Sequence, residues 1–182
     1  MPVRVRTARH PYHRFHHPDT CHAMKTPHFP RQAWIAALPL TLACLVPGAA
    51  WSKAQLEECF DAASEFHQVN PLVLRAIAWQ ESRHNPKAIN RNNNGTTDYG
   101  IMQINSIHLR ELGAYDISAE TLMKPCESIF IAAWYLRRMM DRYGNTWDAV
   151  GSYHSQTPVH RDRYAKGIVS TLRGWGVLQA AR

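Results

Sequence analysis

The segment that most restricts the fold is a twelve-residue, largely apolar stretch at residues 71–82, PLVLRAIAWQES. It follows Asn70, a residue type that caps helix N-termini, and it begins with a proline, which favours the first turn of a helix. This helix must end near Asn85, because the residue before Pro86 is driven out of the helical conformation.

The apolar positions of this helix share one face, which is therefore expected to pack inward. They are Leu74, Ile77, Ala78 and, at the next position of the same face, Glu81. Burial disfavours a charged carboxylate, so Glu81 should have a raised pKa and keep a proton near neutral pH, as a general acid must. The alternatives are that Glu81 turns to solvent at a frayed helix end, or pairs with Arg75 or Arg83 on the surface.

Capping residues and helical spacing predict further helices. Ser52 and Gln55 form a capping box, which starts a helix that runs to about Gln68. Its apolar stripe consists of Leu56, Cys59, Phe60, Ala63 and Phe66. Pro125 starts another helix, which Gly144 ends. The residues expected on its inner face are Cys126, Ile129, Phe130, Ala133, Leu136, Met140 and Tyr143.

A last helix is expected over about residues 161–172, set off by Pro158 and closed by Gly174. Between the helices, Asn94-Gly95 is a strong signal for a short β-hairpin, and its flanks are polar and rich in threonine. The predicted fold class is therefore mainly α, with one short hairpin.

The hairpin returns the chain and can hold Asp98 across a groove from Glu81. One carboxyl group would then lie in an apolar setting and the other in a polar, hydrogen-bonded one. Two carboxyl groups that face each other over a cleft in this way are arranged to cleave a glycosidic bond.

Residues 33–50 are uncharged throughout, follow the basic Lys25 and Arg31, and end in small residues. This pattern is typical of a secretory signal peptide. A membrane-spanning helix and lipid attachment at Cys44 are the alternatives.

A signal peptide usually begins close to its charged end, so we expect translation to start at Met24 and the signal peptide to occupy residues 24–50. Residues 1–23 are then an upstream extension or leader, and residues 51–182 form the mature domain. The leader holds a His-rich run that could bind a transition metal. The alternative is that the leader is untranslated or removed, so that the run has no role. The run consists of His13, His16, His17, Cys21 and His22.

The positive charge of the chain belongs mostly to its first 50 residues. They contribute a net charge of +5, so the +7 of the whole chain leaves only +2 for residues 51–182. This balance does not favour nucleic acid as a partner, but it is compatible with an anionic polymer such as the cell wall.

Past the signal segment only Cys59 and Cys126 remain. An even count in an exported chain predicts one disulfide, and two buried free thiols are the alternative. The bond would close a loop of about 67 residues and stabilise the domain by about 3 to 4 kcal/mol.

Several motifs carry a resemblance to known families. Glu81-Ser82, the 17-residue interval to Asp98, and DYGIMQINS at residues 98–106 resemble the corresponding segment of animal c-type lysozymes. CFDAASEFHQVNPLVLRAIAWQES, GIMQIN, KPCESIFIAAWYL and WDAVGSYHSQTP resemble, in this order, the small lytic transglycosylases that accompany type III secretion, conjugation and pilus systems. This second resemblance covers about residues 55–172.

The resemblance implies a lysozyme-like, mainly helical fold with an SLT-type domain and a peptidoglycan-binding cleft beside the hairpin. Glu81 takes the place of the catalytic acid and base. Tyr153 would orient Glu81 or contact sugar, although His154 and Gln156 stand where many relatives have Asn and Gly. The residues that would line the cleft beside Glu81 are Ser82, Met102, Gln103 and Asn105.

The chemistry implied is cleavage of the bond between N-acetylmuramic acid and N-acetylglucosamine, with the muramoyl 6-hydroxyl closing a 1,6-anhydro ring. No metal or cofactor is implied. Asp98 would stabilise positive charge in the transition state, or only cap the hairpin through backbone hydrogen bonds.

Three functions follow as hypotheses. The first is a periplasmic lytic transglycosylase that opens peptidoglycan locally for an envelope-spanning secretion, conjugation or pilus machine. The second is a lysozyme-like hydrolase that uses Glu81 and Asp98. The third is a wall-binding adaptor with little turnover, which would not need a buried acid. We expect a monomer in each case.

Other conspicuous side chains are expected to be structural. Trp134 and Trp147 could stack on sugars, but we expect them in the core. His108 and His160 are expected on the surface, and their spacing does not suit a zinc site, which is the alternative.

Overall fold

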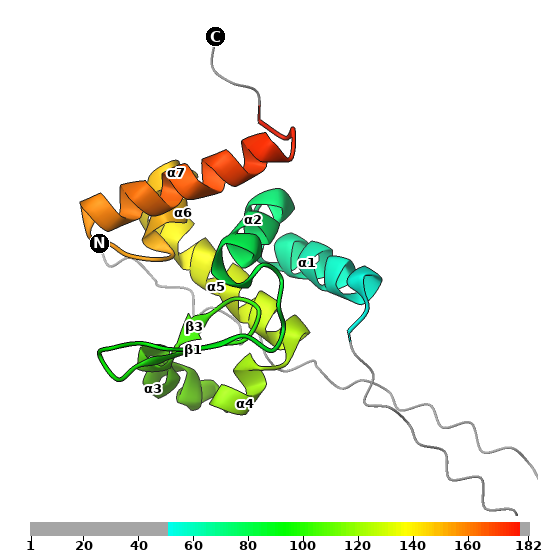
Figure 1. The fold of residues 1–182 in the computed structure, drawn as a ribbon, viewed down its shortest axis with the longest axis vertical. Coiled ribbons are helices and arrows are strands. Elements are labelled where there is room, and N and C mark those ends of the chain that lie inside the picture. The colour runs from blue at the N-terminus through cyan, green and yellow to red at the C-terminus, as the bar shows by residue number, and fades with distance from the viewer. Residues whose placement is uncertain (1–50, 179–182) are drawn as a thin grey trace, which may run out of the picture. The chain divides into compact units, whose positions relative to one another are not determined.

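The order and packing of the helices and strands are shown in Figure 1. The computed structural model describes residues 51–178, so the predictions on the leader, the signal peptide, Met24 and Cys44 lie outside the described part. The longer helices are α1 (Lys53–His67), α2 (Pro71–Ser82), α5 (Pro125–Tyr143), α6 (Trp147–Ser152) and α7 (Pro158–Gly174). The strands are β1 (Ile89–Arg91), β2 (Thr97–Tyr99) and β3 (Ile104–Asn105). Short turns of helix are η1 (Ser106–His108), α3 (Leu109–Leu112), η2 (Gly113–Tyr115) and α4 (Ala119–Leu122).

The domain is mainly helical, as predicted, and none of the helices within residues 51–178 has the length and apolarity needed to span a membrane. The N-terminal caps of the first two helices are those expected. Ser52 and Gln55 exchange both bonds of a capping box, and the side chain of Asn70 accepts from the amides at the start of α2. Helix α2 ends at Ser82 because Arg83 adopts a left-handed conformation, with a φ of 56°.

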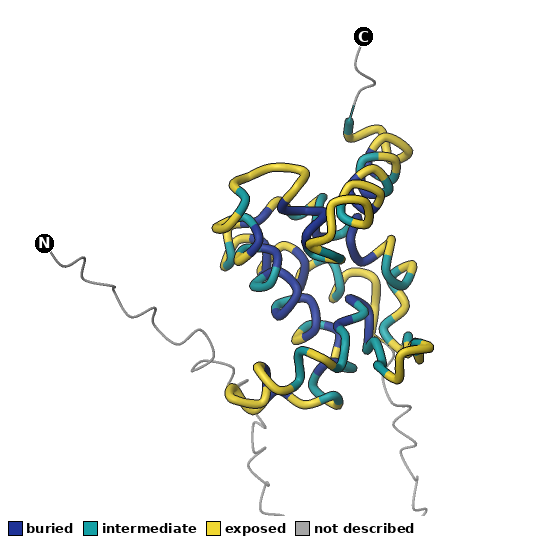
Figure 2. The backbone as a smooth tube through the Cα atoms, turned by 90° about the vertical axis from the view of Figure 1, so that its left-hand side faces the viewer, coloured by how far each residue is buried: buried dark blue, intermediate teal, exposed yellow. Residues whose placement is uncertain are grey.

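Helix α5 is the central element, since it packs against α1, α4 and α6 (Figure 1). Because neighbours lie on several sides, its buried surface is wider than the predicted single stripe. Ile129, Ala133 and Leu136 are buried as expected, whereas Phe130, Met140 and Tyr143 are only half-buried. The buried residues outside the predicted stripe are Pro125, Ser128, Ile131, Ala132 and Met139. Figure 2 shows the buried backbone gathered where the elements face one another.

The predicted disulfide joins the start of α5 to α1, with 5.3 Å between the Cα atoms of Cys59 and Cys126. The predicted stripe of α1 is wrong at its end, because Phe66 is 59% exposed. Its ring lies against His67 and Phe130 at the surface. The chain turns at Gln68 directly after α1, and Val69 is buried at this end instead.

Helix α7 is longer than predicted at both ends. Pro158 does not stand before the helix but occupies its first turn, where a missing N–H costs nothing. Gly174 is the last helical residue and Trp175 is the C-cap. The helix thus gains three residues at its N-terminus, and the backbone of Arg161 in its first turns lies close to Gly151 of α6.

The predicted hairpin is present and is extended by a third strand. β1 and β2 pair antiparallel with Asn90 opposite Asp98, and the turn between them contains Gly95 at a φ of 82°. β3 then pairs with the other edge of β2, which places Asn105 opposite Asp98. The sheet therefore holds Asp98 in its central strand, between polar residues on both neighbouring strands.

We predict that Gly100→Ala destabilises the domain much more than Gly95→Ala. Both glycines have positive φ values, 71° and 82°, which cost an alanine about 1 to 2 kcal/mol. A side chain at Gly100 would also collide with the carbonyl oxygen of Leu122, whereas nothing lies within 4 Å of a side chain at Gly95. Urea denaturation should show a loss of about 1 kcal/mol for Gly95→Ala and of more than about 3 kcal/mol for Gly100→Ala.

Equal losses for the two variants would show that the backbone around Leu122 moves aside. The close approach of residue 100 to the end of α4 would then not be a constraint on the fold.

Candidate active site

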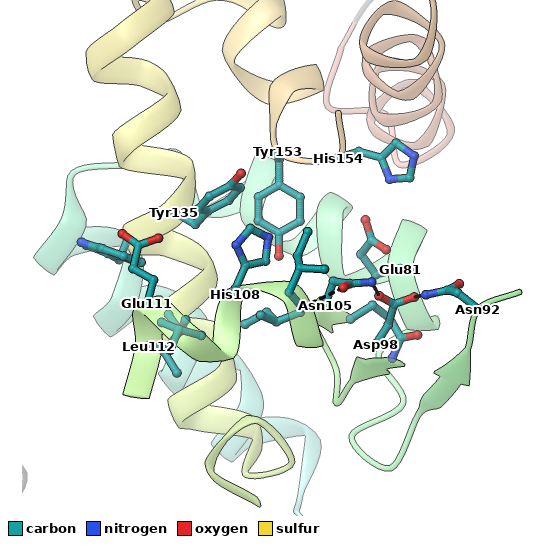
Figure 3. A pocket seen from close by; sticks show the side chains of 15 residues that line it. Glu81, Asn92, Asp98, Asn105, His108, Glu111, Leu112, Tyr135, Tyr153 and His154 are labelled. Atoms are coloured by element: carbon teal, nitrogen blue, oxygen red, sulfur yellow. Dashed lines mark hydrogen bonds between the residues drawn. The ribbon is translucent and has the colours of Figure 1, made fainter. Parts of the chain in front are cut away.

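An open cleft with a volume of about 280 Å³ lies between the sheet with the turns that follow it and the central helix α5. Figure 3 shows Glu81 and Asp98 at one end of this cleft and Glu111 and Leu112 at the other, with Tyr153 between them. The cleft thus collects side chains from α2, β2, α3 and the end of α6.

Glu81 lies on the last turn of α2 and lines the cleft. Its Oε1 accepts a hydrogen bond of 2.5 Å from the hydroxyl of Tyr164, on α7. Burial of the carboxyl group raises the pKa of Glu81 to about 7; the Tyr164 hydrogen bond lowers it, and the charge of Asp98 raises it further. The carboxyl group can therefore both give and take a proton near neutral pH.

The alternative ion pairs of Glu81 are excluded by where the arginines lie. Arg75 pairs with Glu57 and Asp61 on α1. The guanidinium of Arg83 lies over the ring of Trp79, 4.9 Å from its centroid. Glu81 is thus a half-buried acid, with Tyr164 as its one hydrogen-bond donor among residues 51–178, and not a surface charge.

Asp98 has the polar surroundings expected of the second carboxyl group. Its Oδ1 accepts from the side-chain amide of Asn105 at 2.6 Å, and its Oδ2 accepts from those of Asn92 at 2.9 Å and Asn90 at 3.2 Å. Within residues 51–178 the Asp98 carboxyl group accepts from asparagine side chains and from no backbone amide, so the backbone cap proposed as an alternative is not the arrangement found. Figure 3 shows this network on the sheet side of the cleft, facing Glu81.

Of the four residues predicted to line the cleft beside Glu81, Gln103 and Asn105 do so, and Ser82 and Met102 do not. Met102 is fully buried, and the hydroxyl of Ser82 donates to the carbonyl of Ile101 at 2.7 Å. These two residues lie behind the cleft because the chain at 101–102 passes through the core. They support the end of α2 and do not face the open space.

Tyr153 was predicted to orient Glu81 or to contact sugar, but a different tyrosine contacts Glu81. Tyr153 lines the cleft, but its hydroxyl donates to the carbonyl of Met102 at 3.1 Å. The hydroxyl that donates to Glu81 is that of Tyr164, which was not among the predicted site residues. Tyr164 is the one tyrosine of the last helix, residues 158–174, and no local signal shows that this helix packs against α2. Contact of Tyr153 with sugar remains a prediction.

The structure corrects three expectations about conspicuous aromatic and histidine side chains. Trp134 lines the cleft and does not belong to the core, and Arg138 lies over its ring at 4.8 Å from the centroid. Trp147 is 41% exposed and lies away from this cleft. His108 is a half-buried cleft residue and not a surface one; burial is the main reason that its pKa is lowered. His160 is exposed, as predicted.

Residues 51–178 contain no group of three His, Cys, Asp or Glu side chains that could hold a metal ion. The His-rich run of the leader lies outside the described part. The cleft itself presents an acid, Glu81, with a pKa of about 7 and a second carboxyl group, Asp98, held by three amides.

Comparison with known proteins identifies the family. The model of the transglycosylase SLT domain matches residues 58–166, which is more than half of the chain. Protein IpgF of Shigella flexneri is 42% identical over 116 residues, or 61% of this chain and 76% of IpgF. Invasion protein IagB of Salmonella typhimurium (strain LT2) is 40% identical over 121 residues, or 64% of this chain and 76% of IagB. X polypeptide of Escherichia coli (strain K12) is 39% identical over 99 residues, or 54% of this chain and 59% of the relative.

The matched segment contains the whole of the carboxyl site, from α2 through the sheet to Tyr164 of α7. The predicted resemblance to small lytic transglycosylases and the lysozyme-like fold class are thereby confirmed. The chain belongs to the transglycosylase SLT domain family and is an enzyme of the lytic transglycosylase class.

Proposed function

We propose that this enzyme cleaves the β-1,4 bond between N-acetylmuramic acid and N-acetylglucosamine in peptidoglycan and leaves a 1,6-anhydro end on the muramic acid. The observation that carries the proposal is Glu81, a half-buried carboxyl with a pKa of about 7 in an open cleft. A single group with this pKa can give a proton in one step and take one in the next.

In the first step the Glu81 carboxylic acid protonates the glycosidic oxygen. The bond from that oxygen to the anomeric carbon breaks, and N-acetylglucosamine leaves with the proton. In the second step the Glu81 carboxylate takes the proton of the muramoyl 6-hydroxyl, whose oxygen bonds to the anomeric carbon. The acid is regenerated, and no water is consumed, because the attacking hydroxyl is tethered to the sugar that it closes on.

Tyr164 serves both steps through its hydrogen bond to Oε1 of Glu81. The bond favours the carboxylate and so limits how far burial raises the pKa. Without this donor, Glu81 would be a weaker acid for the first step.

Asp98 supports a second candidate function, hydrolysis by a lysozyme-like mechanism. Its carboxylate is held in place by three asparagine amides on the side of the cleft that faces Glu81. Such a carboxylate can stabilise positive charge at the anomeric carbon. In the proposed mechanism it does so while the 6-hydroxyl attacks; in a hydrolase it would do so while water attacks. The adaptor hypothesis is disfavoured, because a binding module has no use for an acid poised in this way.

For the cellular role, we propose local opening of the cell wall for a secretion, conjugation or pilus apparatus. One relative carries the name invasion protein, which fits such a setting. Export by the predicted signal peptide at residues 24–50 would bring the domain to the periplasm, where peptidoglycan lies.

The purified protein should release muropeptides that end in anhydro-muramic acid, and Glu81→Gln should lower their rate of release by at least about a thousandfold, because it removes the general acid. Mass spectrometry of the released products measures both. Anhydro ends are one water lighter than hydrolysis products. Reducing ends would establish the hydrolase, and an undiminished rate in Glu81→Gln would disprove the assignment of the acid.

Asp98→Asn should lower the cleavage rate by about 10- to 100-fold without changing the product, because it removes a negative charge near the anomeric carbon. Asp116→Asn is a matched control, because Asp116 is an exposed aspartate directly after η2. This variant should cleave peptidoglycan at the wild-type rate. Initial rates on purified peptidoglycan measure the difference. An Asp98→Asn rate equal to that of the control would leave Asp98 with a structural role only.

Activity should fall as the pH rises through about 7, since Glu81 must be protonated to act as the acid. Tyr164→Phe removes a donor to the carboxylate, so it should raise the pKa of Glu81 by about one unit and move the falling limb to higher pH by the same amount. Cleavage rates measured between about pH 5 and about pH 9 locate the pH at which the activity falls. A limb that moves to lower pH would mean that Tyr164 does not act through the carboxylate.

A further inference from the structure

His154 has an unusual place beside the site. It follows the end of α6, directly after Tyr153, and it lines the cleft near Glu81 (Figure 3). Its imidazole is parallel to the ring of Tyr164, with an angle of 1° between the planes and 4.9 Å between the centroids. The mechanism proposed above uses Tyr164 and does not use His154.

The stack separates Tyr164 from the open cleft. Tyr164 is only 7% exposed and does not line the cleft, whereas His154 is exposed and does. The imidazole therefore lies between the phenol ring and the cleft, while the ring of Tyr153 also stacks on Tyr164, with 6.5 Å between the centroids. The hydroxyl of that ring is the donor to Glu81.

His154 itself is held by its backbone and its ring face. Its amide donates to the carbonyl of Gly151 at 3.1 Å, and Gly151 packs closely against the backbone of Arg161 on α7. Within residues 51–178 neither ring nitrogen has a hydrogen-bond partner, so no polar bond competes with the stack for the orientation of the ring. The close contact of α6 with α7 at Gly151 thus presents the imidazole to Tyr164.

The titratable groups around the ring come from four elements. His160 and Tyr164 lie on α7, Asp98 lies on β2, Glu81 lies on α2, and Tyr153 precedes His154 at the end of α6. An effect of His154 on the site can therefore arise from its ring face or from its charge. A test must separate the two.

We propose that His154 is a positioning residue, whose ring face holds the Tyr164 hydroxyl on the carboxyl group of Glu81. The contribution of His154 comes from stacking and not from its nitrogens. The proposal rests on the proposed function for the use of Glu81 as an acid, but the geometry of the stack does not depend on turnover.

The test is a carbon-13 NMR titration of the Glu81 carboxyl in the full protein labelled at glutamate, with Glu81→Gln to identify the resonance. The pKa of Glu81 should rise by about one unit in Tyr164→Phe and by about half a unit in His154→Ala, because the donor is lost or loosened. His154→Phe keeps a flat ring without nitrogens, so it should stay within about 0.2 units of the wild type. His160→Ala is the matched control, since it removes a neighbouring imidazole without removing the stack.

Combining His154→Ala with Tyr164→Phe should give the pKa of Tyr164→Phe alone, because His154 has nothing left to position. Three results would each overturn the proposal: a wild-type pKa in His154→Ala, an equal shift in His154→Phe and His154→Ala, or additive shifts in the double variant. The titration does not require cleavage, so it is distinct from a failure of the proposed function, which the muropeptide products would reveal.

Discussion

The carboxyl group of Glu81 is the feature on which the rest of the site depends. It lies on the last turn of α2 at the edge of the core, where charge is costly, and one hydroxyl from α7 compensates in part. This balance of burial against a single hydrogen bond sets a pKa near neutrality. The packing of α7 on α2 therefore affects the pKa of Glu81 as well as the stability of the fold.

The chain at residues 100–103 connects this acid to the sheet. The carbonyls of Ile101 and Met102 accept from Ser82 on α2 and from Tyr153 after α6. The side-chain amide of Gln103 donates to the carbonyl of Gly100, and Gln103 itself has a positive φ of 48°. This short segment thus connects α2, the end of α6 and the sheet. It thereby fixes the positions of the two elements that carry Glu81 and Asp98.

The two carboxyl groups acquire different properties because their surroundings differ. Glu81 follows the fully buried Ile77 and Ala78 on α2, whereas Asp98 lies in the central strand of a small sheet between asparagines of both outer strands. Burial favours the protonated form of Glu81, whereas three side-chain amides fix the position of the Asp98 carboxyl group. This division of roles is the one that cleavage of a glycosidic bond requires.

The sequence alone determined the helices α1, α2 and α5, the hairpin at Asn94-Gly95, and the acid at position 81, because caps, prolines and apolar spacing act within a few residues of one another. The tertiary structure alone decided that Tyr164 rather than Tyr153 reaches Glu81, that Trp134 and His108 line the cleft, and that Met102 and Ser82 stand behind it. These outcomes depend on how α7, α5 and the third strand pack against α2. Contacts between residues more than 80 positions apart, such as Glu81 and Tyr164, leave no local pattern in the chain.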